Sequence, residues 1–323
     1  MGDPLLAGVD GGASKTRAAI ISASGAVLAI STVRSASAYH REPEEAAAVV
    51  VTAVREALAL ARVSGPVAAL GAGLAGADDR TVHERLTRAL AEADLAQTVF
   101  VDHDAAAALA GGAALAPGAV IISGTGSIAF GSGAGGRRAR AGGWGPLLDD
   151  EGSGYAVGRS ILRAAMRAFD GRGEATALEA TVRERFSLST LAALKVAVRG
   201  ISIDEIASIA PLAVKAAATG DPVAARILAR AGERLAAMVA AVARALDWQR
   251  TPFPLVRVGG MFEAGDAITE PMTQALRALA CPAQWHPAQF APEVGAALLA
   301  ARAAGWDTAE LIRRLSRHDK QVR

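Results

Sequence analysis

Two short turns rich in glycine and serine are the segments of this chain best suited to bind phosphate. Residues 10–16 read Asp-Gly-Gly-Ala-Ser-Lys-Thr and residues 123–127 read Ser-Gly-Thr-Gly-Ser, and each stretch ends a short apolar run. Such turns present backbone N–H groups and hydroxyls with little side-chain bulk, which suits phosphate oxygens. An ordinary hairpin would explain either turn alone, but the repetition favours phosphate binding. The candidate phosphate contacts are Gly11, Gly12, Ser14, Lys15, Thr16, Gly124 and Ser127.

Carboxylates accompany these turns in the sequence. Asp10 ends the first apolar run, where a divalent cation between the carboxylate and bound phosphates would explain its position. Asp102 and Asp104 lie between a predicted strand and an alanine-rich helix, and capping of that helix is one explanation of Asp104. Residues 149–151 (Asp-Asp-Glu) lie among glycines. Three acids exceed what one helix cap needs, so we expect a site for a polar ligand there.

The strands that carry the two turns follow the same pattern twice, about 113 residues apart. In each case a strand, a small-residue turn, a second strand, a glycine turn and a third strand follow one another. The expected strands are 5–10, 17–22 and 26–33, and then 119–123, 128–131 and 138–142. We interpret this pattern as a structural duplication with a second domain beginning near Pro117. Alternation of strands with helices after the first set predicts an α/β fold.

Helical and strand patterns predict the remaining elements. Helices are expected at 44–63, 79–92, 105–115, 155–169, 175–186, 189–198, 203–219, 222–246, 270–279, 292–304 and 308–320, and strands at 67–70, 99–102, 255–258 and 284–286. Residues 105–122 carry no charge, but Pro117 and Gly118 interrupt them. A helix followed by a buried strand is therefore predicted rather than a membrane span.

Length and charge limit the class of protein. A chain of 323 residues suggests two domains. Its 34 Lys and Arg nearly balance its 32 Asp and Glu, so we expect no nucleic-acid partner. The one cysteine, Cys281, excludes a disulfide framework and any multi-cysteine metal site supplied by one chain. With no targeting segment predicted, we expect a cytoplasmic enzyme without a membrane partner.

Other patterns in the sequence are weaker signals. Residues 71–76 match G-x-G-x-x-G, which in a dinucleotide site is followed about 20 residues later by an acid at the end of the next strand. Here that strand ends at Asp102, too far along the chain, so a tight strand-to-helix crossing is favoured over dinucleotide binding. The five histidines show no paired metal-ligand spacing. Solvated faces explain the basic clusters, which are Arg137, Arg138 and Arg140, and Arg313, Arg314, Arg317, Lys320 and Arg323 in the tail.

An ordered set of motifs resembles the actin-like sugar kinases. Residues 10–16 and 123–127 resemble the two phosphate loops of that superfamily, and residues 142–155 (GGWGPLLDDEGSGY) closely resemble the signature of N-acetylglucosamine kinases and the related BadF/BcrA-type ATPases. Further segments that resemble the family are 206–227, the adenosine motif at 258–260 and the second connecting helix at 293–297. The resemblance covers nearly the whole chain in the same order.

The resemblance implies two actin-like (ribonuclease H-like) α/β domains with an interdomain cleft. The expected domains are 1–116 and 117–305, with a tail helix, 306–323, returning to the first. It also implies ATP-dependent phosphorylation of a hexosamine, N-acetylglucosamine or glucosamine, at the 6-hydroxyl by a homodimer. The residues matched to family roles are Asp104 (general base), Asp10 (Mg²⁺), Thr125, Gly126, Gly143, Asp150 and Glu151 (sugar), and Gly259 and Gly260 (adenosine).

Departures from the family pattern concern the sugar. His103 replaces the Asn usual beside the base, Asp149 replaces a Gly, and Ala38 stands where the family offers an Asn to the sugar, with Tyr39 or His40 as alternatives. Two other functions are alternatives to a sugar kinase. A dehydratase-activating ATPase needs cysteines for a cluster shared between subunits, and a sugar-sensing regulator needs a DNA-binding unit before the first strand. The sequence favours neither.

Overall fold

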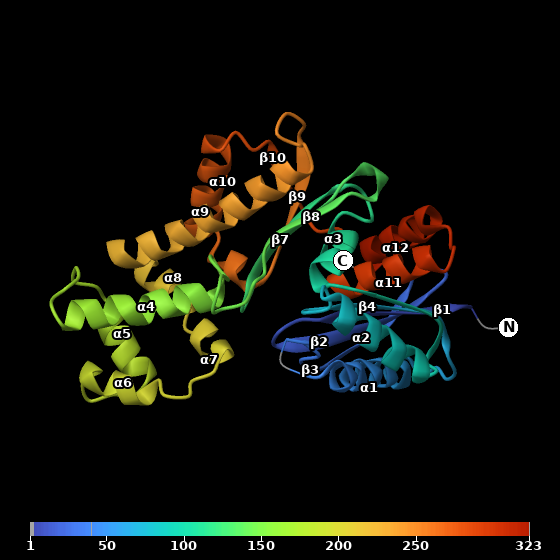
Figure 1. Ribbon diagram of the computed structural model, residues 1–323, viewed down its shortest axis with the longest axis horizontal. Helices are drawn as coiled ribbons and strands as arrows, with labels where there is room; N and C mark the ends of the chain where they lie inside the picture. Colours follow the sequence, from blue (N-terminus) through green and yellow to red (C-terminus); the bar gives the residue numbers. More distant parts are fainter. Residues whose placement is uncertain (1–2, 40, 323) are drawn as a thin grey trace. The chain divides into compact units, whose positions relative to one another are not determined.

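The computed structural model describes residues 3–39 and 41–322, with side chains up to residue 318, and divides into two compact units (Figure 1). The first unit holds the described residues up to Val120 and those from His286 onward, and the second holds Ile121–Trp285. Each unit is built on a five-stranded sheet with helices around it. The predicted α/β fold with two domains is therefore confirmed.

The first sheet has the strand order β3-β2-β1-β4-β5. Its strands are β1 (Leu5–Gly11), β2 (Lys15–Ser22), β3 (Val27–Arg34), β4 (Val67–Leu74) and β5 (Ala96–Asp102). Strands β1, β2 and β3 form an antiparallel meander, whereas β4 is parallel to β1 and β5 is parallel to β4. The carboxyl ends of β1, β4 and β5 therefore share one edge, where Asp10 pairs with Gly73 and Gly73 with Asp102.

Helices cover both faces of this sheet because successive strand residues point to opposite sides. Ala7 and Ile20 belong to a core that includes α1 (Pro43–Ala61) and α2 (Arg80–Glu92). Leu6 and Ile21 belong to a second core with helices from the end of the chain. These are α11 (Pro292–Ala303) and α12 (Thr308–Val322), and they lie on the side of the sheet opposite α1, together with α3 (Asp104–Gly112) (Figure 1).

Helix α11 belongs to the first unit, whereas the sequence grouped residues 286–305 with the second domain. The helix packs on β1, β4 and α3. Glycines allow this contact, because a Cβ at Gly8 or Gly71 would overlap the backbone of α11. Helix α12 packs beside α11 through Leu311 and Leu315. Arg314 in α12 also donates to the carbonyl of Ala23 at 3.0 Å.

The second sheet repeats the order of the first, as β10-β9-β6-β7-β8. Its strands are β6 (Gly118–Ser123), β7 (Ser127–Ser132), β8 (Arg138–Gly142), β9 (Phe253–Val258) and β10 (Ala283–His286). Read from its other edge, the second sheet is β8-β7-β6-β9-β10. In both sheets the order across the sheet is thus third, second, first, fourth and fifth strand of the unit. The duplication inferred from the two turns is thus present in the topology.

Seven helices of the second unit join these strands: α4 (Gly154–Phe169), α5 (Leu178–Arg185), α6 (Leu194–Ala197), α7 (Ile203–Ala207), α8 (Pro211–Ala218), α9 (Pro222–Ala245) and α10 (Asp266–Ala278). One continuous helix was predicted at 203–219, but the structure divides it into α7 and α8. Pro211 begins the second piece, because proline lacks the N–H that would continue the first. In the part of the chain that the structure describes, no helix is long and apolar enough to cross a membrane.

Candidate active site

Asp10 stands at the carboxyl edge of the first sheet. Antiparallel pairing places Arg17 opposite Asp10, and parallel pairing places Gly73 beside it. A Cβ at Gly73 would overlap that of Ala107, so the glycine allows α3 to begin next to this edge. The start of α3 is therefore held close to Asp10.

Asp104 is the first residue of helix α3 and is not its N-cap. The N-cap is His103, whose Nδ1 accepts a hydrogen bond from the N–H of Ala106 at 3.2 Å. Asp102 accepts from the N–H of His103 at 2.9 Å, and Asp104 accepts from the next N–H, that of Ala105, at 2.8 Å. Histidine is an uncommon cap, so the sequence pointed to Asp104 instead. The structure assigns capping to His103.

Glu293 is a carboxylate that the sequence analysis did not assign to the site. It is 0% exposed, and its Oε1 lies 3.0 Å from Nη2 of Arg17. Neither oxygen has a hydrogen-bond partner in the described part of the protein. The sequence signal that could have indicated this site is a single glutamate in an otherwise uncharged, apolar stretch of helix. We call Asp10, Arg17, Asp104 and Glu293 the carboxylate cluster.

Burial and mutual repulsion shape the electrostatics of this cluster. Burial raises the pKa of Asp10 to about 8, with Asp104 and Glu293 adding to the rise and Arg17 and Lys15 opposing it. Burial also raises the pKa of the Asp104 carboxyl, while His103 and the N–H of Ala105 oppose that rise. The cluster is thus short of positive charge.

The first predicted phosphate turn is a tight hairpin between β1 and β2. The N–H of Gly12 donates to the carbonyl of Lys15 at 3.1 Å, and Ser14 and Lys15 are exposed. Thr16 differs from the expectation, because it is 0% exposed and its hydroxyl is buried in β2. Gly11 is also buried, within β1 against Leu74. The residues available to a ligand in this turn are therefore Gly12, Ser14 and Lys15.

The second predicted phosphate turn is joined to the acidic segment that follows β8. Ser123 and Ser127 donate their hydroxyls to the carbonyls of Gly152 and Glu151, both at 2.8 Å. The N–H of Gly154 donates to the carbonyl of Gly124 at 2.8 Å. Two segments that the sequence analysis singled out separately thus form one structure. Ser127 is buried, and its hydroxyl serves this junction rather than facing a phosphate.

Asp150 holds this junction together. It accepts a hydrogen bond from the N–H of Ser127 at 3.1 Å and is 6% exposed. Burial raises the pKa of the Asp150 carboxyl, the N–H of Ser127 opposes the rise, and Asp149 adds to it. Its backbone has a φ of 59°, a strained conformation for a residue other than glycine. A Cβ on Gly126 would press against the carboxylate, so the loop fits closely around Asp150.

Other predicted sugar contacts lie in the same loops. The hydroxyl of Thr125 donates to Asp204 at 3.0 Å, and the N–H of Gly143 donates to the carbonyl of Ser127 at 2.9 Å. Glu151 is exposed, and its carboxylate lies 3.6 Å from Arg234. The side chain of Glu151 therefore points to α9 in this structure.

The predicted adenosine motif lies against the second phosphate turn. Gly259 has a φ of 111°, and a Cβ there would overlap the carbonyl of Ser123. Only glycine fits both the conformation and this close approach. Gly260 has no atoms within 4 Å of a Cβ built on it, so a ligand could approach its backbone. We call residues 123–127, 149–154 and 259–260 the glycine-rich loops.

The departures from the family pattern also have defined positions. Ala38 is partly buried and donates its N–H to the carbonyl of Ala75 at 2.9 Å. Tyr39 is exposed, whereas His40 lies outside the described residues, as does Arg323 of the tail. Asp149 has a buried Oδ2 without a hydrogen-bond partner among the described residues.

Comparison with known proteins identifies the family. A model of the BadF/BadG/BcrA/BcrD ATPase family matches residues 7–300. The chain belongs to this family. An N-acetylmuramic acid/N-acetylglucosamine kinase of Clostridium acetobutylicum is 35% identical over 260 residues, which are 79% of this chain and 84% of that protein. An N-acetyl-D-glucosamine kinase of Dictyostelium discoideum is 30% identical over 316 residues, which are 93% of this chain and 98% of that protein.

A solved structure shows the same fold. A protein from Chromobacterium violaceum, provisionally assigned as an N-acetylglucosamine kinase, superposes with a TM-score of 0.76 and 28% identity. The superposition covers 92% of this chain and 99% of that one. The two units of this chain are therefore actin-like domains. The protein is a kinase that uses ATP.

Proposed function

We propose that this kinase transfers the γ-phosphoryl group of ATP to the 6-hydroxyl of an amino sugar, N-acetylglucosamine or glucosamine. The substrate class comes from the two curated relatives, both of which carry N-acetylglucosamine in their names. The phosphate contacts proposed are Gly12, Ser14 and Lys15 of the first turn together with Gly124 of the second. Gly259 and Gly260 would hold the adenosine, and Thr125, Gly126, Gly143 and Asp150 the sugar.

The position of Asp104 carries the proposal. Its carboxylate has one local hydrogen bond, and His103 performs the capping that would otherwise explain it. The N-terminal turn of α3 favours a negative charge there. Asp104 thus has the features of a carboxylate kept for proton transfer beside the phosphate-binding end of the sheet.

Each residue then has a defined part in the reaction. Asp104 accepts the proton of the 6-hydroxyl as that oxygen attacks the γ-phosphorus. The bond between the γ-phosphorus and the bridging oxygen breaks, so the products are the sugar 6-phosphate and ADP. Backbone N–H groups of the two turns stabilise the charge on the transferred group.

The carboxylate cluster fits a divalent cation. Glu293 has two buried oxygens without hydrogen-bond partners among the described residues, and its one ion pair there is with Arg17. Asp10 would hold Mg²⁺, which neutralises the phosphate oxygens when bound. Among the described residues no three His, Cys, Asp or Glu side chains lie close enough together to hold a metal ion by themselves. Mg²⁺ sites that use one carboxylate and substrate phosphates need none.

The test is release of ADP over a panel of sugars, with and without Mg²⁺. The panel contains N-acetylglucosamine, glucosamine, N-acetylmuramic acid, glucose and a control without sugar. We expect release that depends on both Mg²⁺ and an amino sugar, with a product that carries phosphate on O6 by NMR. ATP hydrolysis of equal rate with and without every amino sugar would exclude the proposal. Phosphate on another oxygen would exclude the 6-hydroxyl as the acceptor.

A further inference from the structure

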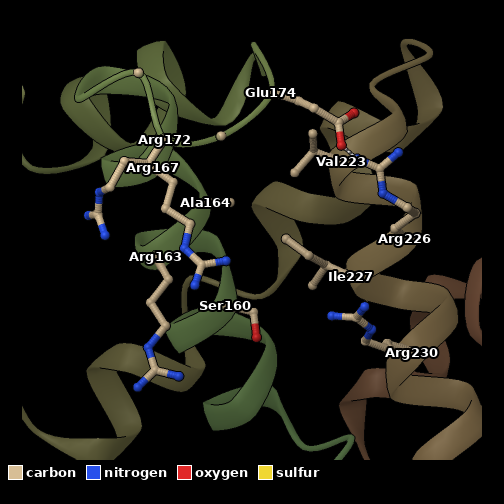
Figure 2. Close-up of a pocket in the computed structure, with 12 residues that line it drawn as sticks. Ser160, Arg163, Ala164, Arg167, Arg172, Glu174, Val223, Arg226, Ile227 and Arg230 are labelled. Carbon is tan, nitrogen blue, oxygen red and sulfur yellow. Dashed lines mark hydrogen bonds and ion pairs between the residues drawn. The ribbon is translucent and has the colours of Figure 1, made fainter.

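A cavity of about 800 Å³ opens between α4 and α9 in the second unit. Arginines occupy both of its walls (Figure 2). Arg163, Arg167 and Arg172 come from α4 and the loop that follows it, and Arg226 and Arg230 come from α9. Figure 2 shows Arg167 and Arg230 directed into the space between the two helices.

The charge of this cavity exceeds that of the whole chain. Five arginines and one glutamate line it, which leaves four positive charges, whereas the chain carries a net +2. Within each helix the arginines are four residues apart, a spacing at which like charges destabilise a helix. Binding of negative charge would relieve this repulsion.

Carboxylates of the chain satisfy only part of this charge. Glu174 lies 2.6 Å from Arg226, and Asp170 lies 2.6 Å from Arg172. Arg163, Arg167 and Arg230 have no carboxylate within ion-pairing distance in the described part of the protein. Three guanidinium groups around one cavity therefore remain available to a ligand.

The location separates this cavity from the proposed nucleotide contacts. Helix α4 begins at Gly154, whose N–H binds the second phosphate turn. Arg167 lies 13 residues further along the same helix, which is about 20 Å at the rise of an α-helix. A ligand in the cavity would thus bind far along α4 from that turn.

From these observations we infer that the cavity is a second ligand site, which binds a small molecule carrying two phosphate groups. Guanidinium groups recognise phosphate through paired hydrogen bonds. Each phosphate monoester carries about −1.5 to −2 at neutral pH, so two of them match the charge of the three arginines that have no carboxylate partner. The volume suits a molecule of metabolite size, and Val223 and Ile227 provide an apolar wall for its uncharged part.

Calorimetry with inorganic pyrophosphate tests the site. The protein is first saturated with Mg²⁺ and a non-hydrolysable ATP analogue, so that the nucleotide site is filled. We expect one further equivalent of pyrophosphate to bind. The double variant Arg167→Gln/Arg230→Gln should bind it about tenfold more weakly or worse.

A matched variant controls for net charge. Arg55→Gln/Arg277→Gln removes two exposed arginines elsewhere on the protein and should bind pyrophosphate as the unchanged protein does. Arg167→Lys keeps the charge but loses the paired geometry, so its affinity should fall as well. Both double variants should keep the KM for ATP and the basal kcat.

Three outcomes would overturn the inference. The first is absence of pyrophosphate binding by the saturated, unchanged protein. The second is equal weakening in the two double variants, which would indicate general attraction by charge. The third is full retention of affinity in the Arg167/Arg230 variant, which would place the bound pyrophosphate elsewhere.

Discussion

Three buried or partly buried carboxylates have different parts in this protein because their hydrogen bonds differ. Asp102 accepts from the N–H of His103, and Asp150 accepts from that of Ser127 in a buried loop junction. Within the described residues, Asp104 accepts from the neighbouring N–H of Ala105 at the start of α3. Asp102 and Asp150 therefore have structural duties that Asp104 lacks. Removing the charge of Asp104 should accordingly affect the reaction more than the fold.

Replacing Asp104 with Asn tests this difference. The amide keeps the shape and can still accept from Ala105, but it cannot take the proton of the sugar. We expect kcat to fall at least about a hundredfold, with little change in Tm or in nucleotide affinity. The measurements are steady-state kinetics and thermal unfolding on one preparation.

The matched control is Asp79→Asn, at the exposed N-cap of α2, where the carboxylate accepts from the N–H of Val82 at 3.0 Å. This variant should lose about 1 kcal/mol of stability or less and keep normal turnover. Near-normal turnover of Asp104→Asn would remove Asp104 from the mechanism and leave Asp102 and Asp150 to be tested as the base.

Ala38 bears on the choice of sugar. The family resemblance places an Asn there, and the position is partly buried beside Gly76. We expect Ala38→Asn to lower the KM for N-acetylglucosamine, because a hydrogen-bonding partner improves recognition of a polar group by about 1–3 kcal/mol. The check is KM for N-acetylglucosamine and for glucose in parallel. An unchanged or higher KM for N-acetylglucosamine would show that this residue does not contact the sugar.

At the scale of elements, caps and glycines determine where the helices of this fold begin and how closely they pack. Asp221 is the N-cap of helix α9, and its carboxylate accepts from the N–H groups of Val223, Ala224 and Ala177 and from the hydroxyl of Thr176. Burial would raise the pKa of the Asp221 carboxyl, but these four hydrogen bonds outweigh it and hold the pKa below the ordinary value of 3.8. The charged form of Asp221 thus stabilises the folded protein.

This cap predicts a dependence of stability on pH. A carboxyl with a lowered folded pKa contributes its full stability above its unfolded pKa and loses it as the pH falls through the folded one. Asp221→Asn should therefore be less stable than the unchanged protein at pH 7, by about 1–2 kcal/mol, because the amide has no charge and only one acceptor oxygen for the four donors. The difference should shrink as the pH falls below about 4. Urea unfolding of both proteins between pH 7 and pH 3 measures it, and a difference that is constant with pH would contradict this account.

At the scale of the whole molecule, the sequence was informative wherever the signal was local. Periodicity, together with glycine and proline positions, predicted the duplicated strands and turns and most of the helices. The same signals predicted a helix and a strand, and no membrane span, at 105–122. The carboxylate of Glu293 did not, because it reaches the site only when α11 packs on β1 and β4, nearly 300 residues after β1 begins. The buried states of Thr16 and Ser127 likewise depend on strand pairing and on a junction with a distant loop. Contacts of this range have no signature in a single sequence.

The chain passes between the two units near residues 120 and 285, which places α11 in the first unit. We therefore expect α11 to unfold together with the strands of the first unit. In native-state hydrogen exchange, peptides from α11 should share the opening free energy of β1 and β4 and differ from those of β6 and β9. Gly8→Ala should lower that opening energy by about 1–3 kcal/mol throughout the first unit, since the new methyl group overlaps α11.

Gly133→Ala is the matched control, because Gly133 has a φ of −95° and a Cβ there makes only ordinary contacts, the closest at 3.5 Å to Trp248. This change should leave exchange in both units as it was. If α11 instead exchanged with β9 and kept its protection in Gly8→Ala, the helix would belong energetically to the second unit, as the sequence-based division expected. If Gly8→Ala lowers the protection of α11, β1 and β4 together and leaves the second unit unchanged, the packing of α11 on Gly8 and Gly71 supports the sheet edge that carries Asp10.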